Sequence, residues 1–141
     1  DRMVIMYDGS GHMKTLADAI QLGKVCDECG LYWLEDPYSD GGVSVRGHQV
    51  LKEYINTPVL ITEHVRNLET TTDMLVAGAT DFARADPDYD GGLTGCHKVA
   101  VAAEGLGMDC EPVDGGVPQC QLLRSQSGAP GLSECLVAAI L

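Results

Sequence analysis

Four acidic residues follow four short apolar segments at nearly equal intervals along the chain. Separated by 27, 28 and 23 residues, they are Asp8, Glu35, Glu63 and Asp86. Each interval is about the length of a strand, a helix and their connecting loops. In a parallel αβ barrel the carboxyl ends of successive strands lie around one face, so acids at these ends would converge. Converging carboxylates repel one another unless a cation lies among them, and their oxygens suit a hard divalent ion such as Mg²⁺ or Mn²⁺. The spacing therefore predicts a divalent metal site.

A simpler interpretation is that these acids are loop residues or helix caps. Asp and Glu are common just before a helix and in its first turn. That interpretation accounts for some of the four acids. It does not account for acids placed directly after four successive apolar segments, and so we favour the metal site.

Strands and helices that would position these acids can be recognised from the apolar pattern. Strands are expected at residues 3–7, 31–34, 59–62, 82–85 and, more weakly, 108–112. The segments between them carry apolar residues at helical spacing, and Gly30 and Asn67 are predicted to cap two of these helices. Short apolar strands that alternate with amphipathic helices favour an α/β fold with parallel strands.

The length of the chain sets a limit on this architecture. A complete eight-unit barrel takes roughly 250 residues, whereas the chain has 141. We therefore expect parallel (βα) repeats forming part of a TIM-type barrel, with about five to six βα units. Residues 1–125 would form this partial barrel, and residues 126–141 a Gly/Ser/Pro-containing break followed by an apolar tail. Incomplete closure leaves strand edges open, which predicts a homo-oligomer.

Composition narrows the classes of partner. With 9 Lys and Arg against 21 Asp and Glu, the net charge of −12 disfavours nucleic acid and anionic membranes as partners. We expect a cytoplasmic protein, because the sequence has neither a membrane-spanning apolar run nor a signal-peptide pattern. Cys26 and Cys29 form a CxxC pair, but no second pair completes a zinc site, so packing is the favoured interpretation.

The residues around the four acids resemble those of a known family. The motifs that carry the resemblance are Tyr7-Asp8-Gly9, Trp33-Leu34-Glu35-Asp36-Pro37, Thr62-Glu63-His64, and Asp86 followed by Gly91-Gly92-Leu93-Thr94. Over about residues 4–116 the chain resembles the C-terminal barrel domain of the enolase superfamily. Within it, the mandelate racemase and muconate lactonizing enzyme branch, which includes the acid-sugar dehydratases, is the most similar.

The resemblance implies roles for particular residues. Asp8, Glu35 and Glu63 would bind Mg²⁺ or Mn²⁺. Asp36 would be a neighbouring acid and not a primary ligand, because adjacent residues of a strand point to opposite faces. Asp86 matches the acid that orients a catalytic histidine in the racemase branch. Such enzymes abstract the proton next to a carboxylate, which leads to dehydration or racemisation of an acid sugar or a 2-hydroxy acid.

Two departures from the family pattern concern the catalytic base. Val113 stands where the family histidine is expected, and the lysine of a KxK-type motif would lie upstream of residue 1. We therefore expect this chain alone to be inactive. His64 is a weak candidate for a replacement base, and His12 is another, although each is more typical of a surface position.

Three functions remain open from the sequence. The first is a fragment of a magnesium-dependent lyase or isomerase that acts on a small carboxylate substrate. The second is a non-catalytic, metal-binding remnant that lacks the base. The third is a different metal-dependent barrel enzyme, such as an aldolase, against which the Trp33–Pro37 and Gly91–Thr94 motifs count.

Overall fold

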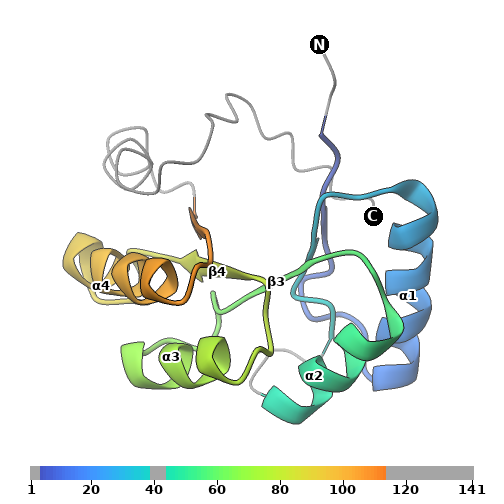
Figure 1. The fold of residues 1–141 in the computed structure, drawn as a ribbon, viewed down its shortest axis with the longest axis horizontal. Helices are drawn as coiled ribbons and strands as arrows, with labels where there is room; N and C mark the ends of the chain where they lie inside the picture. Colours follow the sequence, from blue (N-terminus) through green and yellow to red (C-terminus); the bar gives the residue numbers. More distant parts are fainter. Residues whose placement is uncertain (1–3, 39–43, 114–141) are drawn as a thin grey trace.

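The computed structural model describes residues 4–38 and 44–113. Strands and helices alternate along this part of the chain (Figure 1), as β1 (Tyr7–Asp8), α1 (Leu16–Cys29), β2 (Leu34–Glu35), α2 (Val45–Tyr54), β3 (Val59–Ile61), α3 (Leu68–Val76), β4 (Phe82–Ala85), α4 (Gly92–Gly105) and β5 (Cys110–Pro112). The predicted boundary after residue 125 and the apolar tail lie outside the described residues.

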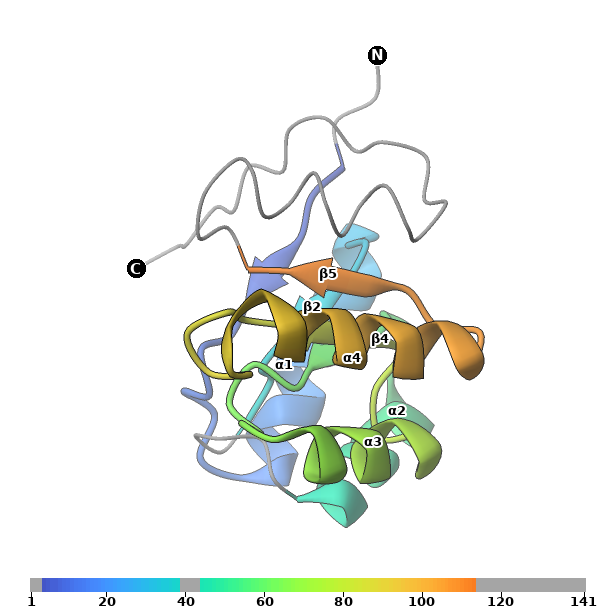
Figure 2. The same cartoon turned by 90° about the vertical axis from the view of Figure 1, so that its left-hand side faces the viewer.

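The strands form one parallel sheet. Their order is β1-β2-β3-β4-β5, so each strand pairs with the strand that follows it in the chain. The four helices of the described part form an arc around the outer side of this sheet (Figure 1), and α4 packs against β4 and β5 (Figure 2). This arrangement confirms the predicted α/β fold with parallel (βα) repeats.

The helices begin and end at residues whose side chains or backbone angles satisfy the free helix ends. The side chain of Thr15 accepts a hydrogen bond from the N–H of Asp18 at the start of α1, and that of Asn67 accepts one from Thr70 at the start of α3. Gly30 ends α1 with a φ of 64°, a left-handed conformation that glycine adopts without strain. The caps predicted at Gly30 and Asn67 are therefore confirmed.

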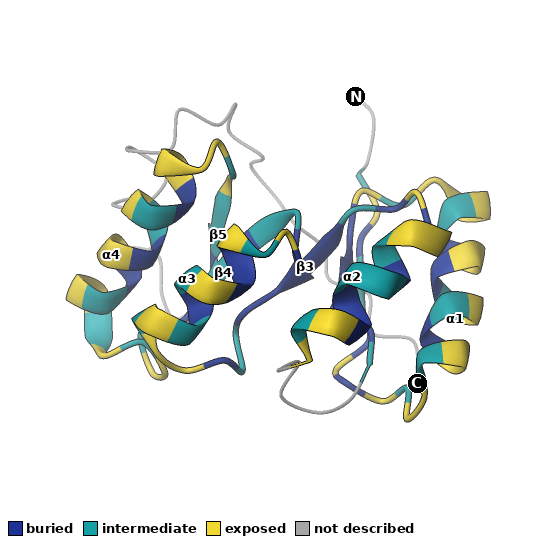
Figure 3. Cartoon of the chain, turned by 60° about the horizontal axis from the view of Figure 1, so that its bottom comes forward, coloured by how far each residue is buried: buried dark blue, intermediate teal, exposed yellow. Residues whose placement is uncertain are grey.

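The core lies between the helices and the strands. Helix residues that face the strands are buried, and those on the opposite side are exposed (Figure 3). One buried cluster includes Leu34, Leu51 and Ile61, and a second, under α4, includes Ala85 and Val99. None of the helices in the described part of the chain combines the length and the apolarity required to cross a bilayer.

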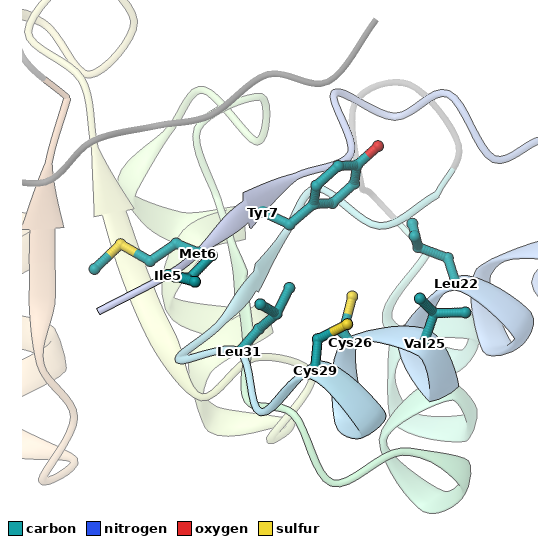
Figure 4. Close-up of a pocket in the computed structure, with 8 residues that line it drawn as sticks. All are labelled: Ile5, Met6, Tyr7, Leu22, Val25, Cys26, Cys29 and Leu31. Atoms are coloured by element: carbon teal, nitrogen blue, oxygen red, sulfur yellow. The ribbon is translucent and has the colours of Figure 1, made fainter. Parts of the chain in front are cut away.

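An apolar cavity of about 390 Å³ lies at the β1 edge of the sheet. Side chains from the β1 segment face side chains from α1 across it (Figure 4), among them Ile5, Leu22 and Val25. Both CxxC cysteines line this cavity, and burial raises the pKa of the Cys26 thiol to about 11. Because metal ligation requires a thiolate, the apolar setting supports the packing interpretation of Cys26.

The carboxylate of Asp27 connects the end of α1 to the start of β3. It accepts hydrogen bonds from the N–H of Asn56 at 3.0 Å and from both the N–H and the hydroxyl of Thr57 at 2.6 Å. Burial would raise the pKa of Asp27, but these hydrogen bonds together outweigh it and hold the pKa below its usual range. A carboxyl with a lowered folded-state pKa stabilises the fold above the pKa of the unfolded chain, and that contribution is lost as the pH falls through the folded-state pKa.

We expect Asp27→Asn to lower the free energy of unfolding by about 2 kcal/mol at pH 7, because hydrogen bonds to a charged acceptor are lost. The difference from the wild type should shrink below about pH 4, where the wild-type carboxyl also becomes protonated. Urea unfolding at pH 7 and pH 3 measures both effects. Glu28→Gln, an exposed neighbour, is the control. A deficit of equal size at both pH values would contradict a role for the charge.

Candidate metal centre at the carboxyl end of the sheet

The sheet brings the four predicted acids to the carboxyl ends of adjacent strands. Asp8 and Glu35 are the last residues of β1 and β2, and they are paired in the strand register. Glu63 follows β3 by two residues, and Asp86 directly follows β4. The carboxylates lie near enough to influence one another, since the charges of Asp8 and Glu63 both act on Glu35.

Glu35 is buried and paired with an arginine that the sequence analysis did not single out. Its side chain is 5% exposed, and that of Arg84 on β4 is 12% exposed. The Nε of Arg84 donates to Oε1 of Glu35 at 2.8 Å, and a second guanidinium nitrogen donates to Oε2. A signal for Arg84 was present: it lies two residues before Asp86 in an otherwise apolar strand, and residues two apart on a strand share a face.

The ionisation of these acids depends on their surroundings. Burial raises the pKa of Glu35, with the Arg84 guanidinium opposing this effect and the charges of Asp8 and Glu63 adding to it. Burial also raises the pKa of Glu63; His64 and Arg84 oppose this rise. A carboxyl group whose pKa is raised by neighbouring acids is stabilised in its charged form by a nearby positive charge, which a bound cation would supply here.

Asp36 lies in this cluster, contrary to the prediction from strand alternation. Its Oδ2 is 3.2 Å from Nε2 of His64. Asp36, Glu63 and His64 each have one possible ligand atom, and these three atoms all lie within 4.8 Å of one another. Alternation fails because Asp36 lies beyond the end of β2 and has a φ of 38°. Burial raises the pKa of Asp36 to about 8, and the nearby Glu35, Glu63 and Asp8 contribute in the same direction.

Asp86 is held in the turn that precedes α4. Its Oδ1 accepts a hydrogen bond from the N–H of Asp88 at 2.7 Å, and its own N–H donates to Oδ2 of Asp90 at 2.8 Å. Val113 lies on the neighbouring segment, where its N–H donates to the carbonyl of Ala85 at 2.9 Å. The side chain next to this strand end is therefore an aliphatic one that cannot transfer a proton.

Two histidines were named as candidate bases, and the structure places them differently. His64 is half-buried beside Asp36 and so lies within the acidic cluster. His12 is exposed in the loop after β1 and makes an isolated bridge to Tyr38. Of these two, His64 alone is placed at the carboxylates.

The donor set fits a hard divalent cation. Asp8, Glu35 and Glu63 offer only carboxylate oxygens, which Mg²⁺ and Mn²⁺ prefer over nitrogen or sulfur. The charges of Asp8 and Glu63 raise the pKa of Glu35, and the charge of Asp8 raises the pKa of Glu63, so the three acids belong to one electrostatic cluster. In the structure part of the positive charge that balances them is the Arg84 guanidinium.

Comparison with known families identifies the class of protein. The model of the family described as "Enolase C-terminal domain-like" matches residues 1–136. The chain therefore belongs to the enolase superfamily, in the group that contains mandelate racemase and muconate lactonizing enzyme, as the motifs around the four acids predicted.

Individual relatives are dehydratases and racemases. The chain is 29% identical over 110 residues to a D-galactonate dehydratase family member of Paenibacillus sp. strain JDR-2, covering 78% of this chain and 26% of the relative. It is 30% identical over 117 residues to an N-succinylamino acid racemase of Amycolatopsis sp., covering 82% and 30%. The chain thus spans less than a third of the length of these relatives.

Solved structures show the same fold. A racemase from Streptomyces coelicolor A3(2) with bound magnesium has a TM-score of 0.77 at 22% identity, covering 92% of this chain and 35% of that one. An L-talarate/galactarate dehydratase variant liganded with Mg and L-glucarate has a TM-score of 0.76 at 22% identity, covering 88% and 30%. The described sheet and helices are therefore part of a TIM-type barrel.

Proposed function

We propose that the chain is part of a magnesium-dependent dehydratase or racemase that removes the proton next to a carboxylate. The observation that carries this proposal is the placement of Asp8, Glu35 and Glu63 at the carboxyl ends of three adjacent parallel strands. A divalent cation held there would supply positive charge against the negative charge that develops on the substrate as the proton leaves. Mn²⁺ would fit the same oxygen ligands.

The proposed metal centre also indicates the chemical class of the substrate. A cation between carboxylates favours a substrate that brings its own oxygen ligands, such as the carboxylate and hydroxyl of an acid sugar or a 2-hydroxy acid. The solved dehydratase liganded with Mg and L-glucarate supports this class. Family membership argues against the alternative of an aldolase-like barrel.

The catalytic base is proposed to come from outside the described residues. Val113 is aliphatic, and Asp86 is engaged with the N–H of Asp88 in its own turn. Asp86 would then act by its charge near Glu63, whose pKa it raises. The alternative is a non-catalytic protein that binds the ion without turning over a substrate.

Extending the chain distinguishes these two functions. The coding sequence before residue 1 is read for a strand with a KxK-type lysine, and the longer product is tested on a panel of sugar acids with MgCl₂, with loss of water followed by NMR. Turnover by the longer product, abolished by Glu63→Gln, is the expected result. The absence of such a strand, or inactivity of the longer product, would favour the non-catalytic alternative.

The 141-residue chain itself is expected to exchange no proton next to the carboxylate of a sugar acid, even with Mg²⁺. Stabilising the developing charge does not suffice unless a base reaches the substrate proton. Incubation in D₂O followed by NMR is the sensitive measurement. Exchange that occurs in the wild type and disappears in His64→Ala would reverse this expectation and make His64, already paired with Asp36, the base.

Self-association is also proposed, because β1 and β5 are the outer strands of the described sheet and an apolar cavity adjoins β1. Light scattering after size exclusion, over a tenfold dilution, should show a mass above that of one 15.0 kDa chain. A monomer at every concentration would argue against it.

A cytoplasmic location is proposed too, supported by the free thiols of Cys26, Cys29, Cys96 and Cys110 among the described residues.

A further inference from the structure

Arg84 is a cationic side chain inside the acidic cluster. Its guanidinium makes two parallel hydrogen bonds to the two carboxylate oxygens of Glu35. This is the bidentate geometry in which arginine binds a carboxylate most strongly. Both oxygens of the central acid among the three proposed ligands are therefore already in use.

The strand that carries Arg84 is fixed by the neighbouring strand end. Thr62 lies just past β3, and its Oγ1 accepts a hydrogen bond from the N–H of Arg84 at 2.8 Å and donates one to the carbonyl of Arg84, also at 2.8 Å. The guanidinium carbon lies 5.9 Å from the centre of the Trp33 ring, which is within reach of a cation–π contact. The backbone of Arg84 is thus fixed, and its side chain, 12% exposed, lies against Glu35 and Trp33.

The guanidinium balances negative charge that a divalent ion would otherwise balance. It attracts Glu63 as well as Glu35, and both residues belong to the proposed ligand set. A divalent ion placed next to the guanidinium would be repelled by it, since like charges in a buried site are screened little. One carboxylate also cannot keep both hydrogen bonds to arginine while its oxygens coordinate an ion.

We propose that Arg84 is an internal counter-ion that competes with the divalent ion for Glu35. The ion gains Glu35 as a ligand when the guanidinium moves away from it, and this competition lowers the affinity of the centre. Arg84 is therefore a positioning residue that sets metal affinity. The inference rests on the proposed metal centre at Asp8, Glu35 and Glu63.

Calorimetry with MgCl₂ and with MnCl₂ on the whole chain tests the competition. Arg84→Gln should bind the ion about tenfold more tightly than the wild type, because the competing charge is gone. Arg46→Gln is the matched control. It makes the same change at an exposed arginine on α2, whose partner is Glu53, and should leave the affinity within about twofold of the wild type.

The fluorescence of Trp33 provides a second readout, which can be followed in the wild type as well as in the variants. Trp33 is the single tryptophan of the chain, and the centre of its ring lies 5.9 Å from the guanidinium carbon of Arg84. Adding MgCl₂ should change its fluorescence in the wild type and in Arg46→Gln but not in Arg84→Gln. If circular dichroism shows that Arg84→Gln is unfolded, the titration of the wild type decides. The proposal is overturned if the ion binds to the wild type and changes neither the emission of Trp33 nor the NMR signal of the Arg84 Nε–H.

The outcomes separate this inference from the proposed function. Equal or weaker binding by folded Arg84→Gln overturns the competition and leaves the metal centre standing. Absence of binding by both proteins overturns the metal centre together with the inference. Tighter binding by Arg84→Gln, with the fluorescence change restricted to proteins that retain Arg84, supports both.

Discussion

Glu63→Gln is expected to weaken binding of Mg²⁺ by about 100-fold, because the charge count of the ligand set largely determines the affinity of an oxygen site. Glu63 follows β3, and burial together with the charges of Asp86 and Asp8 raises its pKa. The amide has nearly the shape of the carboxylate but lacks its charge, so the variant changes electrostatics more than packing. Isothermal titration calorimetry with MgCl₂ on the 141-residue chain measures the loss.

The matched control for this prediction is Glu53→Gln. Glu53 is exposed on α2 and pairs with Arg46 at the surface, so the same change of charge should leave affinity unaltered. Asp8→Asn should weaken binding to a similar extent as Glu63→Gln, since Asp8 is the acid at the end of β1. If Glu63→Gln and the wild type bind Mg²⁺ equally, the ligand assignment is wrong.

Gly95→Ala is expected to lower the free energy of unfolding by about 3 kcal/mol, at the upper end for overpacked positions. A Cβ at Gly95 would lie 1.5 Å from the carbonyl oxygen of Asp90, which is backbone and cannot rotate away. The same turn fixes Asp86, because the N–H of Asp90 donates to the carbonyl of Asp86 and Asp90 Oδ2 accepts from the N–H of Asp86, both at 2.8 Å. The added methyl group would push α4 away from the turn that carries this acid.

Gly105→Ala serves as the control for Gly95→Ala. It lies at the other end of α4, and an added Cβ would meet no atom within 4 Å. Alanine favours a helix over glycine by up to about 1 kcal/mol, so this variant should be as stable as the wild type or slightly more stable. Urea unfolding followed by circular dichroism compares the two. Similar stability of the two variants would contradict the close contact at Gly95.

The fold was predictable because the apolar segments and the helix caps carry local signals. The carboxyl ends of the strands were predicted to within one residue, and the caps at Gly30 and Asn67 were assigned correctly from spacing and residue type. The parallel order followed from the alternation of strands and helices. The length of the chain predicted that the barrel would be incomplete. The described part has five strands, fewer than the eight of a closed barrel.

The site was predictable only as far as strand position determines it. Asp8 and Glu35 ended up in register because each ends a strand. Arg84 was not predicted as a site residue because the repeating pattern in the sequence is carried by acids, although the two-residue period of a strand already placed it on the same face as Asp86. Its partner could not be deduced from the sequence, since the contact with Glu35 joins residues 49 positions apart.

Asp36 was placed on the wrong face because it lies beyond the end of its strand. Side chains alternate between the two faces of a sheet only within a strand, and Asp36 has a positive φ that the sequence does not reveal. Non-glycine residues with such angles are uncommon and cluster at functional sites, where the surrounding contacts hold them. Here the hydrogen bond from the N–H of Asp36 to the carbonyl of Leu60, at 3.0 Å, is one such contact.

The order β1-β2-β3-β4-β5 also determines how the cluster of acids can assemble during folding. Asp8 and Glu63 are 55 residues apart, yet no step has to close a loop of that length. β2 can pair with β1 as soon as α1 has formed, and β3 can then pair with β2, so each step joins neighbouring units. On the ribosome, each βα unit would find its docking surface already synthesised. The carboxylates would therefore be brought together one at a time, from Asp8 onward.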